Sequence, residues 1–245
     1  MVLAIDHSET YKLTKLKYVP HIVRLRAIRR VVKKYGVGHG SLADFGCSNG
    51  FITKIISEDL QASSAKGFDH SENIEVARSN YHNISFDYID LNKTQDVALQ
   101  YDTVTCFETI EHVGKPEMAI KNLLNSRSKD GVIIISVPIE VGFVGIVKYF
   151  VKRVLYRYPL ELNVEAKQYF QSLLKGDRIS QYRGEADGFS THFGFDYRDI
   201  DDILSSLGCE DYQTWRSFTS QFFVIGGSRS ASRRARANSL SGIRA

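Results

Sequence analysis

The chain has 245 residues, of which 43% are hydrophobic and 24% are charged, so it can bury one sizeable core or two small ones. The formal net charge is +4, but five arginines after Gly227 account for it, and the remainder of the chain lies near −1. Because the positive charge is confined to this end, the net charge does not indicate that the rest of the chain binds nucleic acid. The three cysteines, at positions 47, 106 and 209, are too far apart to suggest a disulfide framework or a zinc knuckle.

The N-terminal region contains a basic amphipathic helix. Residues 1–18 mix acidic and basic side chains without an apolar stretch, so we expect no secretory signal and a cytoplasmic protein. Over residues 18–35, apolar side chains recur at helical spacing among arginines and lysines. We interpret residues 1–40 as a helical cap whose cationic side chains extend into water, in preference to a membrane or RNA contact.

After residue 40, strands and helices alternate along the chain. Strands separated by ten to fifteen helical residues require crossover connections, which build a parallel sheet with helices on both faces. We expect strands at 41–47, 65–69, 85–89, 102–107 and 132–137, and helices at 51–60, 72–81, near 94–99 and at 116–126.

The last predicted elements follow a different rule. A helix at 197–207 ends before Gly208, and two aromatic-rich runs follow at 212–218 and 221–225. Because only two residues separate these runs, they predict an antiparallel hairpin. A parallel sheet that ends in such a hairpin differs from an ordinary dinucleotide-binding domain.

An insertion interrupts the alternating pattern at residues 140–190, on the side where a substrate is expected. Within it, residues 145–158 form a second basic amphipathic helix, which we interpret as a lid, with an interfacial anchor as the alternative. One α/β domain then covers residues 41–227, and residues 228–245 are expected to be a disordered basic tail.

A glycine-rich turn follows the first expected strand, in the segment Asp44-Phe45-Gly46-Cys47-Ser48-Asn49-Gly50. Gly46 allows a tight turn and close approach of a ligand, and Gly50 lets the next helix begin. The spacing is GxxxG and not GxGxxG, so no usual pyrophosphate cradle is implied. Asp69 ends the second strand and can accept both hydroxyls of a ribose, while Asp90 after the third strand can accept an adenine amine.

In this order, the strand ends resemble the cofactor site of class I S-adenosylmethionine (SAM) dependent methyltransferases, over roughly residues 41–137. The resemblance implies a doubly wound, mostly parallel, Rossmann-like sheet of seven strands in the order 3-2-1-4-5-7-6, with an antiparallel C-terminal hairpin and a helical insertion after the fifth strand. It implies SAM as the cofactor, with Asp44 at the methionine amino group, Gly46 beneath it and Phe107 in the pocket. The other cofactor-binding residues that it implies are Phe45, Cys47, Gly50, Asp69, His70, Asp90 and Leu91.

A group of acidic and histidine residues follows the fourth strand. Glu108, Glu111 and His112 have the spacing i, i+3 and i+4, which on a helical turn projects them from one face and suggests half of a divalent-metal site. The segment resembles the ExxEH motif of ubiquinone-pathway O-methyltransferases and of small-RNA 2′-O-methyltransferases. In the small-RNA group, a distant histidine completes the metal site. Here that histidine would be His192, with Mg, Mn or Zn as the metal. In the metal-free alternative, His112 or His192 acts as general base and Glu111 is a further catalytic candidate.

The favoured function is methyl transfer to an oxygen, rather than a nitrogen, of a small-molecule, sugar or lipid-linked acceptor. Aromatic residues of the insertion would form the walls of the acceptor site. One alternative is a metal-dependent RNA 2′-O-methyltransferase. No second histidine cluster surrounds His192, which weakens this alternative, so nucleic acid is not the expected partner. The other alternative is a SAM-binding module without catalysis. The sequence leaves peripheral membrane contact and the oligomeric state open.

Overall fold

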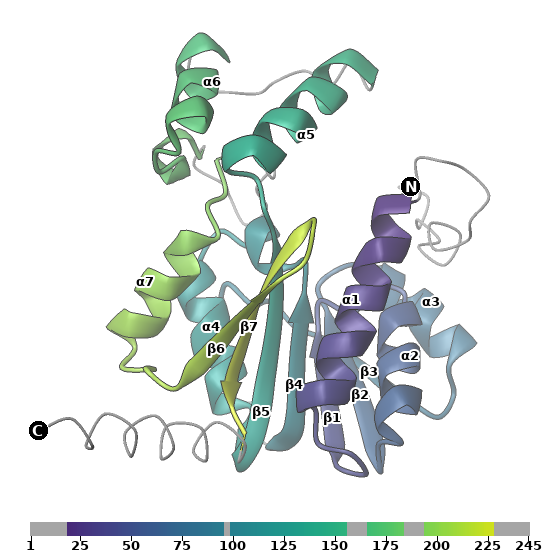
Figure 1. The fold of residues 1–245 in the computed structure, drawn as a ribbon. Coiled ribbons are helices and arrows are strands. Elements are labelled where there is room, and N and C mark those ends of the chain that lie inside the picture. The colour runs from purple at the N-terminus through teal and green to yellow at the C-terminus, as the bar shows by residue number, and fades with distance from the viewer. Residues whose placement is uncertain (1–18, 96–98, 156–165, 184–193, 228–245) are drawn as a thin grey trace, which may run out of the picture.

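The computed structural model describes residues 19–95, 99–155, 166–183 and 194–227. A seven-stranded sheet runs through its centre in the order β3-β2-β1-β4-β5-β7-β6 (Figure 1). The first five strands pair in parallel, and β7 pairs antiparallel with both β5 and β6. The fold and strand order expected from the resemblance are therefore confirmed. The strands are β1 (Ser41–Phe45), β2 (Ser64–Asp69), β3 (Ser85–Tyr88), β4 (Tyr101–Phe107), β5 (Arg127–Pro138), β6 (Tyr212–Arg216) and β7 (Ser220–Gly226).

Helices cover both faces of the sheet, because each central strand presents apolar side chains on both sides. On β5, Ile133 and Ile135 enter one core with Ile120 and Leu204, whereas Ile134 enters a second core with Ile28 and helix α2. The two cores therefore lie on opposite faces. The helices are α1 (Val19–Tyr35), α2 (Phe51–Leu60), α3 (Asn73–Asn80), α4 (Pro116–Asn125), α5 (Gly142–Leu155), α6 (Ala166–Lys175) and α7 (Arg198–Ser206), with short 3-10 turns η3 (Ile110–His112) and η4 (Ser180–Tyr182).

Several predicted bounds need correction. Helix α5 begins at Gly142 rather than at residue 145. Strand β5 begins at Arg127 rather than at residue 132, and its pairing with β4 shifts register between Tyr101 and Thr103. The hairpin turn contains three residues rather than two, and the amide of Ser217 donates to the carbonyl of Ser220 at 2.9 Å. Of the short helix expected near 94–99, residues 94, 95 and 99 are not helical, and 96–98 lie outside the described residues.

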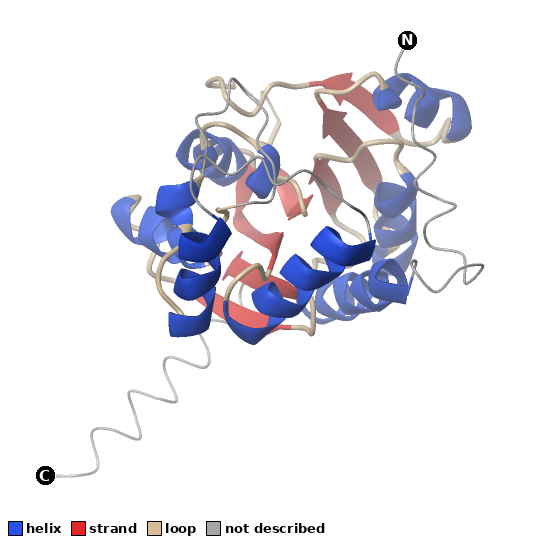
Figure 2. Cartoon of the chain, turned by 90° about the horizontal axis from the view of Figure 1, so that it is seen from above, coloured by secondary structure: helices blue, strands red, loops and turns tan. Residues whose placement is uncertain are grey.

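The insertion forms a small layer of its own above the carboxyl ends of the strands. Helices α5 and α6 lie on this side, and in the view from above they are nearest to the viewer (Figure 2). They pack around a separate apolar cluster that includes Ile139, Tyr169 and Leu173. Residues 228–245, predicted to be a disordered tail, lie outside the described residues.

None of the helices that the structure describes combines the length and the apolar content that crossing a membrane requires.

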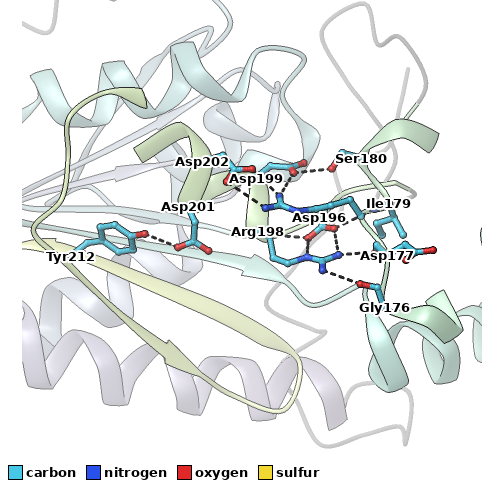
Figure 3. Close-up of polar contacts among 11 residues, drawn as sticks. Gly176, Asp177, Ile179, Ser180, Asp196, Arg198, Asp199, Asp201, Asp202 and Tyr212 are labelled. Carbon is cyan, nitrogen blue, oxygen red and sulfur yellow. Dashed lines mark hydrogen bonds and ion pairs between the residues drawn. The ribbon is translucent and has the colours of Figure 1, made fainter. Parts of the chain in front are cut away.

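A polar network ties the insertion to the core at the start of α7 (Figure 3). Arg198 pairs with the buried carboxylate of Asp196 at 2.6 Å and donates to the carbonyls of Gly176 and Asp177 after α6. Arg178, which also follows α6, pairs with Asp199 of α7 at 2.8 Å. These contacts fix the position of the segment after α6 relative to α7.

Candidate functional site

A cavity of about 440 Å³ opens at the carboxyl edge of the sheet. It lies where the ends of β1, β2 and β4 converge, which is the usual ligand position in open α/β sheets. Helix α1 forms a further wall. The lining residues are His21, Arg24 and Ile28 from α1; Asp44 and the turn residues Gly46, Cys47, Ser48 and Asn49; Phe51 and Ile52 from α2; Asp69 and Ser71; and Phe107, Glu108, Thr109 and His112.

The glycine-rich turn contains three residues with a left-handed backbone: Gly46, Ser48 (φ +48°) and Gly50. Gly46 has φ +79°, and a Cβ atom there would collide with the side chain of Thr109. The amides of Gly46 and Cys47 both donate to the carbonyl of Phe68, at 2.7 and 3.0 Å. Gly50 has φ +76°, and a Cβ atom there would lie 2.8 Å from the ring of Phe86. Side chains are therefore excluded at both glycines, which lets the backbone of the turn line the cavity.

Asp69 organises the rim of the cavity. One carboxylate oxygen accepts the amide of Ser48 at 2.6 Å, and the other accepts the amide and the hydroxyl of Ser71, both at 2.7 Å. These donors hold the carboxylate in one orientation at the end of β2. These donors use three of the carboxylate's roughly four lone-pair positions, so one stays open for a ligand, and rotation of the Ser71 hydroxyl frees a second.

Asp44 is a buried carboxylate in the cavity wall. It is 2% exposed, and it accepts hydrogen bonds from the hydroxyls of Thr53 at 2.6 Å and Thr105 at 2.7 Å. Burial raises the pKa of Asp44 to about 6, although both hydroxyls act in the opposite direction. A positively charged ligand group in the cavity would favour the ionised form.

Five of the predicted cofactor residues do not line this cavity. Phe45 is fully buried and stacks on Phe68 with the ring centroids 4.8 Å apart, and Leu91 is in the same core. Asp90 accepts the amide of Asn92 at 3.0 Å and pairs with Lys93 at 3.1 Å. The other two are His70, which is exposed, and Gly50, which begins α2.

The structure corrects the expected arrangement of the acidic and histidine segment. Glu108 has φ +48°, so the chain reverses there and the 3-10 turn η3 begins only at Ile110. The three side chains therefore do not project from one helical face. His112 lines the cavity, whereas Glu111 is fully buried behind it, with its carboxylate 4.0 Å from His112 Nε2. Burial and the nearby charge of Glu108 raise the pKa of Glu111 well above its usual range.

The surroundings of Glu108 do not fit a divalent cation. One carboxylate oxygen accepts the Ser136 hydroxyl at 3.0 Å, and the other pairs with Arg24 at 3.1 Å. A guanidinium at this distance repels a second cation on the same oxygen. Within residues 19–95, 99–155, 166–183 and 194–227, no three His, Cys, Asp or Glu side chains form a metal-ligand group. His192 lies outside the described residues, so its metal and catalytic roles stay predictions.

Among the cavity residues that the sequence prediction missed are His21 and Arg24 of helix α1. Helix α1 contains six arginines and lysines. Its amphipathic pattern does not show which of these side chains enters the cavity and which extend into water. The pairing of Arg24 with Glu108 turns one cation of this helix into the cavity. The one sequence feature that could have indicated this pairing is Glu108 itself. It is an acidic residue immediately after a buried strand, where a cationic partner is needed.

Comparisons with known proteins were made by sequence and by fold. A family model described as a methyltransferase domain matches residues 18–211. A ubiquinone biosynthesis O-methyltransferase of Coxiella burnetii is 30% identical over 105 residues, which are 41% of this chain and 43% of that protein. A putative methyltransferase of Invertebrate iridescent virus 6 is 27% identical over 46% of this chain and 43% of its own length. This chain therefore spans less than half of these relatives.

Solved structures share the fold over most of the chain. The PH0226 protein of Pyrococcus horikoshii OT3 has a TM-score of 0.58 at 16% identity, over 90% of this chain and 99% of that one. Magnesium protoporphyrin IX methyltransferase of Synechocystis PCC 6803, solved with bound SAH, has a TM-score of 0.55 at 16% identity, over 90% and 92%. The family model matches most of the length of this chain, and solved structures share its fold. This chain therefore belongs to the methyltransferase domain family, in the class I SAM-dependent form that the sequence predicts.

Proposed function

We propose that this protein transfers the methyl group of SAM to an oxygen of a small-molecule acceptor. The observation that carries the proposal is the single cavity onto which β1, β2 and β4 end, with Asp44, Asp69 and His112 in its wall. SAM is a sulfonium compound, so its methyl group is already activated for transfer. The protein then has to bind, to orient and to accept a proton.

The charges of the cavity match the polar groups of SAM. The oriented carboxylate of Asp69 would accept the ribose hydroxyls, and the buried carboxylate of Asp44 would pair with the ammonium of the methionine part. Arg24, held in the wall by Glu108, would supply the positive charge for the methionine carboxylate. The ammonium, the carboxylate and the ribose hydroxyls of the ligand thus each have a counterpart on a different element.

His112 is the proposed proton acceptor. Its imidazole lines the cavity, and 40% of the side chain is exposed, so an acceptor hydroxyl can approach it. Glu111 lies directly behind it and would orient the ring. An alcohol that is to be methylated has to lose its proton, and a neutral histidine near physiological pH can accept one. One sequence relative is named as a ubiquinone biosynthesis O-methyltransferase, which supports an oxygen as the methylated atom.

Calorimetric titration tests the cofactor site separately from catalysis. We expect S-adenosylhomocysteine to bind the wild-type protein, and Asp69→Asn to weaken this binding by roughly a hundredfold, because two charge-assisted hydrogen bonds are lost. The matched control is Asp87→Asn, which changes the same charge on the exposed side of the neighbouring strand β3. Equal affinity of all three proteins would reject the proposed cofactor site.

Catalysis is tested by an acceptor screen with labelled SAM. Among hydroxylated and phenolic compounds, we expect turnover that falls by roughly a thousandfold in His112→Ala, because loss of a general base typically costs this much. Binding of S-adenosylhomocysteine should be unchanged in that variant. Normal turnover by His112→Ala would remove the imidazole from the reaction.

A further inference from the structure

Exposed apolar side chains gather on the side of the molecule that carries the cavity. The described part of the chain has nine large hydrophobic residues with exposed side chains, and seven of them are on helices α1, α5 and α6 or in the β6–β7 turn. Phe143 is 79% exposed and Phe218 is 78% exposed. We call this set the apolar rim: Val19 and Val23 on α1, Phe143, Val147 and Phe150 on α5, Leu174 on α6, and Phe218 in the β6–β7 turn.

Three independent connections place these elements on one side. Helix α5 follows the carboxyl end of β5 after only three residues. The β6–β7 turn is at the same level, since Ser220 pairs with Pro138 at the end of β5. The first turns of α1 also reach this level, because His21 and Arg24 line the cavity. Figure 1 shows α5, α6, the turn of the hairpin and the start of α1 along its upper side.

Helix α5 differs from an ordinary lid. Its inner side packs with Val144 and Ile146 on the insertion's own apolar cluster. Its outer side shows Phe143 and Val147, at spacing i and i+4, to the solvent, and Phe150 at i+7 is 48% exposed, with its ring against Phe170 of α6. A lid helix of a globular protein would have charged or polar residues on that outer side. Apolar residues on both sides are typical of a helix whose outer surface meets another apolar phase.

The helices that carry most of the apolar rim are cationic. Helices α1, α5 and α6 contain Lys or Arg but neither Asp nor Glu. Some of these cations are paired, as Arg24 is with Glu108 and Lys148 with Glu140, whereas Lys167 and Lys175 on α6 are exposed. A surface that combines exposed phenylalanines with exposed lysines complements an anionic lipid headgroup layer.

We propose that the apolar rim docks this protein on an anionic membrane surface, with α5 lying in the headgroup layer and the cavity facing the bilayer. A second copy of the chain fits less well, because a two-fold interface would bring the cationic helices against one another. RNA fits less well too, since phosphates do not require exposed Phe and Val side chains. Docking itself does not depend on the proposed function. If the proposed methyl transfer holds, docking implies that the acceptor is an amphiphile with its reactive hydroxyl at the lipid surface.

Vesicle flotation tests docking without any catalytic readout. The full chain is mixed with vesicles of phosphatidylcholine alone, or with about 30 mol% phosphatidylglycerol, at about 0.1 M and about 1 M salt. We expect flotation with the anionic vesicles only, and loss of it at the higher salt. Phe143→Gln/Val147→Gln should weaken partitioning by at least roughly tenfold, because two inserted apolar side chains are lost.

Two controls keep the result interpretable. Leu99→Gln changes an apolar residue that is 61% exposed just before β4, away from the carboxyl edge, and should float like the wild type. Lys167→Glu/Lys175→Glu reverses two charges on α6 and should reduce flotation without changing the apolar rim. S-adenosylhomocysteine affinity should be unchanged in all of these variants, which separates failure of docking from failure of the cofactor site.

Several outcomes would overturn the proposal. Equal flotation of wild type and Phe143→Gln/Val147→Gln, or no flotation of a wild type that binds S-adenosylhomocysteine, would each reject a lipid surface. Sedimentation that shows a dimer converted to monomer by the same double variant would assign the apolar rim to a second copy. Binding of an RNA oligonucleotide that competes with vesicles and survives the double variant would assign the cationic helices to RNA.

Discussion

The buried carboxyl group of Asp44 makes cofactor binding depend on pH. Its pKa is raised to about 6 by burial, so the group is largely protonated below that pH in the protein without ligand. An ammonium group binds the ionised form, so binding must release the proton. We therefore expect the affinity for S-adenosylhomocysteine to fall by about tenfold for each pH unit below 6 and to level off above it. Calorimetry between about pH 5 and 8 measures this dependence.

The sign of the stability change follows from the same shift. An unfolded aspartate has a pKa near 3.9, so between about pH 4 and 6 the folded protein binds more protons at Asp44 than the unfolded chain does. Its contribution to stability is therefore complete below pH 4 and declines by up to about 3 kcal/mol as the pH rises to about 6. Asp44→Asn should show neither dependence, and a pH profile that this variant leaves unaltered would assign the titration to another group.

Gly46 is expected to tolerate no side chain, for a steric reason in addition to its backbone angle. Gly46→Ala would combine φ +79° with a collision against Thr109, and we expect a loss of roughly 3 kcal/mol in unfolding free energy together with weaker cofactor binding. Gly208→Ala is the matched control, since φ is +68° there and nothing lies within 4 Å of the added carbon. That control should lose only about 1 kcal/mol. Urea denaturation compares the two, and equal losses would show that Thr109 gives way.

At the scale of elements, the ion pair of Asp196 and Arg198 holds the insertion to α7. Burial opposes ionisation of Asp196, but hydrogen bonds from Arg198 and from the Ile179 amide hold its pKa below the ordinary value. We expect Asp196→Asn to cost roughly 3 kcal/mol at pH 7, because it leaves a cation and a buried amide without their charge partner. The loss should shrink as the pH falls through the pKa of the native carboxylate, since the wild type loses the pair there too.

Asp202→Asn is the control for this network. Its carboxylate also pairs with Arg178, at 3.0 Å, but 66% of the side chain is exposed. Water screens such a pair, so the loss should stay within about 0.5 kcal/mol. Chemical denaturation at pH 7 and near pH 3 distinguishes the two variants. If Asp196→Asn is as mild as Asp202→Asn, the network in Figure 3 does not hold the insertion.

Local pattern predicted most of the elements, because their periodicity is strong. Helix α2 spans Phe51–Leu60, as expected from its apolar spacing, and most of the strands up to β4 begin or end within a residue or two of their predicted bounds. The missed features depend on contacts between distant residues. The left-handed conformation of Glu108 is held by Ser136 and Arg24, far away in the chain, and no pattern around Glu108 indicates it.

The same limit applies to the candidate site. Asp44, Gly46, Asp69 and Phe107 could be placed at strand ends from the sequence, and they do line the cavity. Asp90 was placed by the same reasoning, but its carboxylate bonds to Asn92 in its own loop. A strand-end position brings a residue to the right edge of the sheet without fixing the direction of its side chain. That direction depends on local hydrogen-bond partners.

For the whole molecule, the C-terminal hairpin is a requirement for folding. Strand β7 pairs with β5 along seven positions and buries Phe222 and Phe223 in the two cores. We expect a chain ending at Asp211 to lack a cooperative unfolding transition and to lose S-adenosylhomocysteine binding, because β5 would have a bare apolar edge. Thermal denaturation followed by circular dichroism tests this expectation. A truncated chain that melts cooperatively would show that the hairpin is an accessory.

The place of β7 in the sheet also has a consequence during synthesis on the ribosome. Strand β5 ends at Pro138, whereas its neighbour β7 begins only at Ser220. At ordinary elongation rates the interval between them takes roughly 4 to 16 s. Throughout that time the nascent polypeptide exposes the edge next to Ile133 and Ile135, a template for mispairing with other nascent chains. Chaperones that shield hydrophobic segments emerging from the exit tunnel should therefore raise the yield of native protein, most of all where translation is slow.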